Sequence, residues 1–259
     1  YSISFDETKL QKNIFLLNII IFFIVIIGLI TIYIIYKIRL KEFILSYKDK
    51  FIEHSIHEIK TPLAILNLNL QLKNEEFGED KYSKKMEGAI KTLKNSYEDM
   101  TFLHTKSKIK YKIEKFNLEE FLKDRVKYFE LIAKTQNREL KLEVANNVFV
   151  NISKIELERL VDNNISNAIK YSSVASTIKI ILEDCVLKFI SNGEKIKDTN
   201  IIFKRYVREN ISLGGHGIGL SIVKDICDKY KIKIDVTSQE NHNIFSYRLN
   251  CHTNITSKG

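Results

Sequence analysis

Hydrophobic patterning divides the chain into a long apolar run, a pair of heptad segments, and a stretch where helix and strand patterns alternate. The apolar run, residues 14–36, carries no charge. As a helix rising about 1.5 Å per residue it would reach about 34 Å, enough to cross the hydrocarbon core of a bilayer. A buried soluble helix is rarely apolar on every face, and a signal peptide would be shorter and would end in small residues. The run therefore predicts a transmembrane helix at 14–36.

Basic residues gather on the C-terminal side of this run, at Lys37, Arg39 and Lys41, whereas charges before the run balance one another. The positive-inside rule then places the rest of the chain, beginning with a juxtamembrane helix at 37–50, in the cytoplasm. Because the first residue is Tyr1, we expect residues 1–13 to be an extracytoplasmic remnant. The missing upstream part would hold an external sensor domain and an earlier span.

Two segments after the run follow a heptad pattern, which is typical of paired helices. Between them, Gly78 and its polar neighbours mark a turn, so we expect a helical hairpin within a domain at 51–110. A lone hairpin buries two seams poorly, which favours a homodimer that pairs two hairpins into a four-helix bundle. The seam positions are Ile52, Ile56, Ile59, Leu63, Leu66 and Leu70, and then Met86, Ile90, Leu93, Tyr97 and Met100.

His57 lies one position off the first seam, so we expect it to flank the bundle core and to face solvent. Pro62, the single proline, has no N–H to give the carbonyl of Glu58, so the helix should bend or loosen beside His57. Taken alone, a surface histidine is usually inert and a proline kink is usually tolerated. A metal pair of His54 and His57 fits helical spacing, but the zinc-protease pattern HExxH fails at Thr61.

From about residue 111 to 252, helix and strand patterns alternate, which predicts a mixed sheet with helices on one face. Amphipathic helices are expected at 117–136 and at 153–172, the latter with Ser153 as a cap. The expected strands are 139–144, 147–151, 177–183, 185–191, 231–238 and 243–249.

Two groups of residues in this region could bind a phosphorylated ligand. Asn163 and Asn167 share a helix face ahead of Lys170; they could be caps or packing polar groups, or amide ligands of Mg²⁺ beside a phosphate-binding lysine. Four glycines between 214 and 219 open a further helix and would let the backbone approach a phosphate. The segment is not a P-loop, because no GK[ST] follows, and no strand immediately precedes it as in a Rossmann motif.

Charge and cysteine content exclude some functions. The net charge is +9, but the lysines are scattered and no basic run is interleaved with aromatics, so we expect no nucleic-acid partner. Cys185, Cys227 and Cys251 are far apart in sequence and form no CxxC, so we expect reduced cytoplasmic thiols rather than a disulfide framework or a zinc site.

Over roughly residues 51–249 the chain resembles a sensor histidine kinase of bacterial two-component signalling. HEIKTPLA at 57–64 resembles the phosphoacceptor box, NNISNAIKYS at 163–172 the asparagine box, IFKRYVR at 202–208 the phenylalanine box, and GGHGIGLSIV at 214–223 the second glycine box. The resemblance implies a membrane-anchored α + α/β protein. A HisKA-type dimerisation and phosphotransfer domain would precede a two-layer α/β sandwich of the HATPase_c type that binds ATP and Mg²⁺.

The resemblance also implies roles for individual residues. His57 would accept the phosphoryl group, Glu58 would be its general base, and Arg208 would reach the γ-phosphate. Thr61 completes an HExxT pattern that implies phosphatase activity toward a response-regulator receiver domain, the expected partner. The residues expected to hold the nucleotide and its metal are Asn163, Asn167, Lys170, Tyr171, Gly215, His216, Gly217 and Gly219, with Asn163 and Asn167 as the Mg²⁺ ligands. The location implied is the bacterial inner membrane, with the catalytic part in the cytoplasm.

The chain departs from the family pattern at the first glycine box, ISNGEKI. An aspartate that bonds the adenine amino group is replaced by Ser191 or, with a one-residue gap, by Asn192, ahead of Gly193. Both replacements are uncharged, so we expect weaker nucleotide affinity or altered base selectivity. The alternative function is therefore a degenerate or phosphatase-only sensor that acts by binding partners.

Overall fold

The computed structural model describes residues 7–106, 109–145, 148–205 and 217–253, and it divides into two compact units, Tyr1–Ser55 and Ile56–Gly259. Helix α1 (Glu7–Phe77) contributes to both units, and its helical assignment continues through Pro62. The proline therefore does not end the helix, although it removes one backbone hydrogen bond.

The first unit contains one segment, Gln11–Ile44, that is long and apolar enough to cross a membrane, judged by length and composition. Its large side chains are exposed to the surroundings, as at Phe15, Phe22 and Ile30. Such a large contiguous apolar surface is unfavourable in water, so the segment suits a lipid environment. The span predicted at 14–36 lies within this segment.

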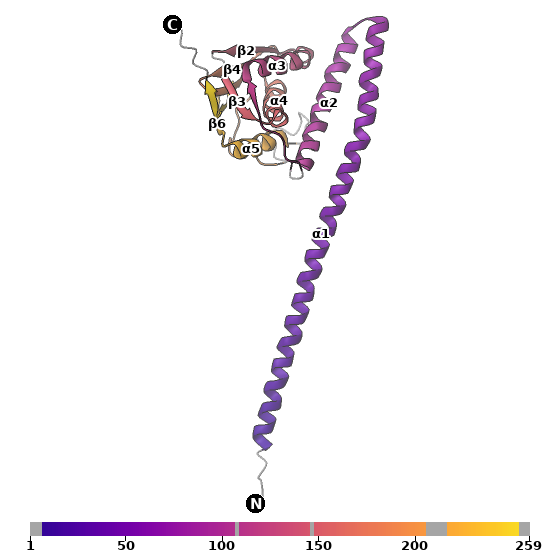
Figure 1. Ribbon diagram of the computed structural model, residues 1–259, viewed down its shortest axis with the longest axis vertical. Coiled ribbons are helices and arrows are strands. Elements are labelled where there is room, and N and C mark those ends of the chain that lie inside the picture. Colours follow the sequence, from indigo (N-terminus) through magenta and orange to yellow (C-terminus); the bar gives the residue numbers. More distant parts are fainter. Residues whose placement is uncertain (1–6, 107–108, 146–147, 206–216, 254–259) are drawn as a thin grey trace, which may run out of the picture. The chain divides into compact units, whose positions relative to one another are not determined.

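The predicted hairpin turn is present between α1 and α2 (Lys81–Thr105) (Figure 1). Gly78 adopts a φ of +76°, in the left-handed region that favours glycine. The Asp80 side chain accepts two backbone N–H groups of α2 at 2.7 Å, while the Ser83 hydroxyl accepts the Asp80 N–H at 2.9 Å. Lys73 of α1 donates to the Asp80 carboxylate at 2.6 Å, so the cap joins the two helices.

The heptad seams are only half covered within one chain. Ile56, Leu63 and Leu70, seven residues apart, are buried. The exposed members of the two seams are Ile59, Leu66, Met86 and Leu93. A single hairpin therefore leaves apolar surface uncovered, as the pattern predicts.

The rest of the second unit contains two β-sheets (Figure 1). The larger is mixed: β2 runs parallel to β4, and the other neighbours are antiparallel. Its strand order is β2 (Glu139–Val144), β4 (Thr177–Glu183), β5 (Val186–Ser191), β7 (His242–Arg248) and β6 (Lys233–Gln239). The smaller sheet is antiparallel, in the order β1 (Glu114–Asn117), β3 (Val148–Ile152) and β8 (Cys251–Thr253). The strand expected near 147–151 belongs to this separate sheet.

Three helices pack on one face of the larger sheet: α3 (Leu118–Thr135), α4 (Lys154–Tyr171) and α5 (Gly219–Tyr230) (Figure 1). Along β4, Ile178 and Ile180 are fully buried while Lys179 between them is exposed, so the other face is open. The predicted two-layer arrangement is confirmed for this part of the chain. Ser153 occupies the N-cap position of α4 but makes no side-chain cap bond.

One expectation about the cysteines is wrong. Cys185, in the turn between β4 and β5, lies with its Cα 5.9 Å from that of Cys251 in β8, and the two sulfurs are disulfide-bonded. The two cysteines are 66 residues apart in sequence. They meet because the chain after β7 returns to the start of β5, where the Leu249 N–H donates to the Cys185 carbonyl at 2.8 Å. Cys227 is a free thiol that is fully buried, and burial raises its pKa to about 12.

Candidate functional site

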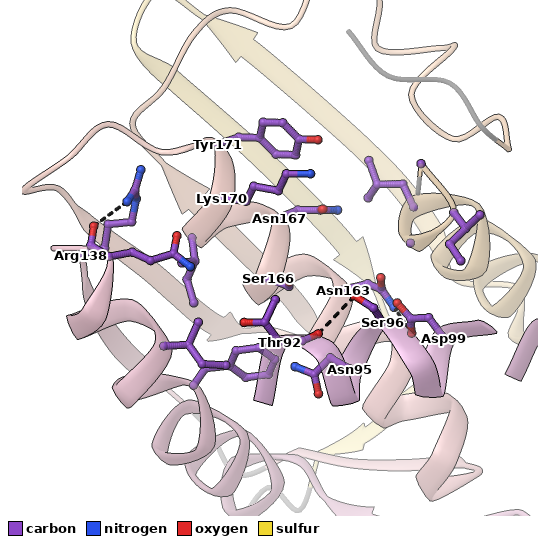
Figure 2. Close-up of a pocket in the computed structure, with 18 of the residues that line it drawn as sticks. Thr92, Asn95, Ser96, Asp99, Arg138, Asn163, Ser166, Asn167, Lys170 and Tyr171 are labelled. Carbon is purple, nitrogen blue, oxygen red and sulfur yellow. Dashed lines mark hydrogen bonds between the residues drawn. The ribbon is translucent and has the colours of Figure 1, made fainter. Parts of the chain in front are cut away.

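Two adjoining cavities follow one face of α4. The helix-side cavity, of about 610 Å³, lies among α2, α3, α4 and the start of α5 (Figure 2). The sheet-side cavity, of about 560 Å³, lies among α4, β5, β7 and the loop after β5. Their shared walls are Arg138, Asn167, Lys170, Tyr171, Ile202 and Leu220.

The helix-side cavity is lined by polar groups from several elements. Asn163, Asn167 and Lys170 lie along α4 on the same side (Figure 2), which confirms that the two asparagines share a face. Asn163 is buried, and its Nδ2 donates to Asp99 Oδ1 at 3.0 Å and to the Arg159 carbonyl at 2.9 Å. Lys170 Nζ lies 4.8 Å from the centre of the Tyr171 ring, a cation–π distance.

Two glycines of the predicted motif have physical reasons to be glycine. Gly217 lines the helix-side cavity with a φ of +66°. At Gly219, the first residue of α5, an added Cβ would lie 2.1 Å from Asn163 Oδ1, so any side chain would collide with that amide. The motif therefore brings the N-terminus of α5 against α4. A helix N-terminus, whose first N–H groups have no partner within the helix, is suited to binding anions.

The sheet-side cavity combines apolar walls with a few fixed polar groups. Asn164 is held by its Oδ1, which accepts from Tyr247 at 2.7 Å, and Asn243 by its Nδ2, which donates to the Glu194 carbonyl at 2.9 Å. Ser191, at the end of β5 and opposite Asn243 in register, is also buried. The apolar lining consists of Ala168, Phe189, Ile196, Ile202, Leu220 and Phe245. A flat aromatic ring with polar edges suits such a cavity.

The loop after β5 is fastened to the end of α4. Ser172 and Gly193 form an antiparallel bridge, and the Ser173 N–H donates to the Asn192 carbonyl at 2.6 Å. A Cβ at Gly193 would lie 2.4 Å from the Tyr171 carbonyl oxygen, so only glycine fits. Ser191 and Gly193 line the cavity, whereas Asn192 serves through its backbone. Of Ser191 and Asn192, Ser191 is therefore the one whose side chain lines this cavity.

Arg138 and Asp99 are lining residues that no motif in the sequence marks. Arg138 Nη2 donates to the Ser172 carbonyl at 2.6 Å and its Nε to the Ser172 hydroxyl at 2.9 Å, so it braces the end of α4 beside both cavities. Desolvation lowers the pKa of Arg138. Asp99 follows Glu98 on a polar face of α2, a pattern that ordinarily indicates solvent exposure, yet its side chain is only 14% exposed.

Several predicted site residues are not brought to these cavities by the structure. Glu58 and Thr61 are exposed on α1 and do not line either cavity in the part of the chain that is described. His57 lies within α1, but its side chain is outside the described set. Arg208, Gly215 and His216 also fall outside the described residues.

Comparisons with known proteins agree with this geometry. The family described as "Histidine kinase-, DNA gyrase B-, and HSP90-like ATPase" matches residues 152–252, which include α4, β5, the following loop and α5. Sensor histidine kinase HprS of Escherichia coli is 28% identical over 214 residues, 78% of this chain and 47% of the relative. Phosphate regulon sensor protein PhoR of Haemophilus influenzae is 27% identical over 215 residues, 76% of this chain and 50% of the relative.

Solved structures share the fold. Histidine kinase AdeS of Acinetobacter baumannii superposes with a TM-score of 0.50 and 21% identity, covering 74% of this chain and 96% of that one. ShkA, solved in complex with AMPPNP, superposes with a TM-score of 0.51 and 16% identity, covering 78% of this chain and 47% of that one. The chain spans about half the length of the curated relatives HprS and PhoR. The ATPase domain and the sensor kinase relatives together support a two-component sensor histidine kinase.

Proposed function

We propose that this chain is the kinase part of a membrane-bound two-component sensor, which uses ATP to phosphorylate His57 and passes the phosphoryl group to an aspartate of a response-regulator receiver domain. The observation that carries the proposal is the pair of adjoining cavities along α4. One has the apolar walls that a nucleobase needs, and the other has the amides, lysine and helix N-terminus that phosphates need.

The base of ATP would enter the sheet-side cavity, beside Phe189 and Phe245, with Tyr171 along its open side. The phosphates would extend past Lys170 toward the N-terminus of α5. Asn163 and Asn167 fit the requirements of Mg²⁺, because amide oxygens are hard ligands and the two side chains lie on one face. When bound there, Mg²⁺ neutralises phosphate charge.

The transfer step follows from the chemistry of imidazole. A neutral nitrogen of His57 attacks the γ-phosphorus in line, forming an N–P bond as the bond to the β,γ-bridging oxygen breaks and ADP leaves. Glu58 accepts the proton that the imidazole ring loses, and Arg208 offsets charge on the γ-phosphate oxygens. The phosphohistidine then gives its phosphoryl group to a carboxylate of the regulator, which regenerates His57.

The half-covered seams support a dimer. A second copy would cover Ile59, Leu66, Met86 and Leu93 of the hairpin, completing a four-helix bundle. The apolar segment Gln11–Ile44 supports an anchor in the bacterial inner membrane, with the catalytic part in the cytoplasm.

A second function, regulator phosphatase without kinase activity, is favoured by one observation. The buried end of β5 carries the neutral Ser191 where a carboxylate would bind an adenine amino group more strongly. Thr61, four residues after His57, supports the phosphatase reaction in either case.

The deciding experiment incubates the full chain in detergent micelles with γ-labelled ATP and Mg²⁺. Kinase function predicts an acid-labile, base-stable label that is lost in His57→Gln and kept in the matched variant His54→Gln. Bound nucleotide without any label on the wild-type chain would support the phosphatase instead.

A further inference from the structure

Buried polar side chains of the sheet-side cavity differ in how they are satisfied. Asn164, Ser172 and Asn243 are each hydrogen-bonded to other groups of the protein. Ser191, at the end of β5, is only 7% exposed, yet its hydroxyl makes no hydrogen bond to any residue within the described ranges. Because buried polar groups are normally paired, this hydroxyl is the group left for a ligand in the cavity that Ser191 lines.

A hydroxyl at this position can pair with either purine. It donates one hydrogen bond, accepts others, and rotates to suit its partner. Ser191 can therefore accept from the 6-amino group of adenine or donate to the 6-oxo group of guanine. An ionised carboxylate in its place could only accept, so it would leave a 6-oxo group unpaired and would select adenine.

The apolar walls of the cavity do not separate the two bases. Phe189, Ile196 and Phe245 offer contacts to the faces of a flat ring, and adenine and guanine share the same fused ring. Discrimination by an apolar wall is weak when two ligands differ only in polar groups at the edge. Selectivity for the base therefore depends on the polar residues that line the cavity.

Glu194, three residues after Ser191, is a second such residue. The loop that carries it is held on both sides, since the Glu194 carbonyl accepts from Asn243 Nδ2 at 2.9 Å and the Ile196 N–H donates to Ser238 Oγ at 2.8 Å. Glu194 lines the cavity, and its carboxylate has no hydrogen bond or ion pair with the residues that the structure describes. An acceptor with two oxygens is thus available at the mouth of the cavity.

Guanine carries the groups that such an acceptor requires. Its N1–H and 2-amino group are adjacent donors, which match the two oxygens of a carboxylate, whereas adenine has an acceptor at N1 and no amino group at position 2. Hydrogen bonds to an ionised group are stronger than neutral ones. Glu194 therefore favours guanine, while Ser191 pairs with both bases.

We infer that the site takes guanine as well as adenine nucleotides, so that Mg²⁺–GTP is a second phosphoryl donor to His57. The inference rests on the proposed nucleotide site and reaction. The transfer balances as it does for ATP: an N–P bond to His57 forms, the bond from the γ-phosphorus to the β,γ-bridging oxygen breaks, the ring proton passes to Glu58, and GDP leaves.

Comparing two nucleotide analogues tests the inference. The full chain in micelles is titrated with Mg²⁺–AMPPNP and with Mg²⁺–GMPPNP in a calorimeter. We expect GMPPNP to bind no more than about tenfold more weakly than AMPPNP, because the hydroxyl pairs with both bases and one net hydrogen bond changes affinity by at most about that factor. A larger preference for AMPPNP would overturn the inference.

Two variants assign the selectivity to its residues. Glu194→Gln should weaken binding of GMPPNP by about tenfold and leave that of AMPPNP unchanged, and Ser191→Ala should weaken both by a similar factor of about five. Glu183→Gln, an exposed carboxylate of β4 that does not line the cavity, is the matched control and should bind both analogues like the wild type. Equal effects of Glu194→Gln on the two analogues would overturn the role of Glu194 and with it the inference.

A labelling experiment separates this inference from the proposed function. With γ-labelled GTP and Mg²⁺, we expect an acid-labile label on the wild-type chain that is lost in His57→Gln and kept in His54→Gln. Labelling by ATP but not by GTP would overturn the inference and leave the kinase proposal standing. If neither AMPPNP nor GMPPNP binds, the proposed nucleotide site itself is wrong.

Discussion

Replacing Gly193 by alanine should distort the nucleotide site, because the added Cβ has no room. The added Cβ would lie 2.4 Å from the Tyr171 carbonyl oxygen. An ordinary contact is about 3.5 Å, so the loop after β5 or the end of α4 must move by about 1 Å. The obstacle is backbone, and both sides are held by the Ser172–Gly193 bridge and by the 2.6 Å bond from Ser173 to Asn192.

Overpacking of this kind costs about 2 kcal/mol, so Gly193→Ala should lower the midpoint of thermal unfolding of the second unit by roughly 4–8 °C. The same shift separates the walls shared by the two cavities and should weaken Mg²⁺–AMPPNP binding about tenfold. Circular dichroism in micelles and titration calorimetry measure the two effects. Gly28→Ala, where nothing lies within 4 Å of the added Cβ, is the control. A Gly193→Ala protein that unfolds and binds like the wild type would refute the argument.

Three further perturbations test other parts of the account. Ser191→Asp gives the sheet-side cavity a charged acceptor, so ATP should bind about tenfold more tightly and GTP more weakly when measured by calorimetry. Unchanged affinities would show that the base does not bind beside β5. One residue inserted after Ile44 rotates the following part of α1 by about 100° and should change the rate of histidine phosphorylation in vesicles. Equal rates after one to four inserted residues would rule out direct coupling of the apolar segment to His57 through a continuous helix. The bond from Lys73 and the N–H groups of α2 lower the pKa of Asp80 from 3.8 to about 2. The ionised carboxylate should therefore stabilise the hairpin above pH 4, and this stabilisation should be lost as the pH falls toward 2. An NMR titration that gives Asp80 an ordinary pKa would contradict this role of the cap.

The sequence alone predicts those helices and hairpins whose residue patterns are local. The amphipathic period around Asn163 predicts α4, alternation predicts the β4–β5 and β6–β7 hairpins, and Ile218, Ile222 and Ile226 predict the buried face of α5. Each of these signals lies within about twenty residues of chain.

Features that depend on distant pairing could not be predicted this way. β1 and β8 are short strands that exist because β3 lies between them, and their partners are far away in sequence. Cys185 and Cys251 meet for the same reason. Asp99 and Arg159 look like solvated charges on separate helices, and only tertiary packing turns them into a buried pair beside Asn163.

Mapping the phosphoryl group would show whether nucleotide bound along α4 phosphorylates His57. The full chain would be incubated with Mg²⁺–ATP, digested at alkaline pH, and analysed by mass spectrometry with fragmentation that preserves N–P bonds. We expect phosphate on His57, none on His54, and no phosphate on His57 in the Asn167→Ala variant. Phosphate on another residue, or none under conditions where the protein binds ATP, would contradict it.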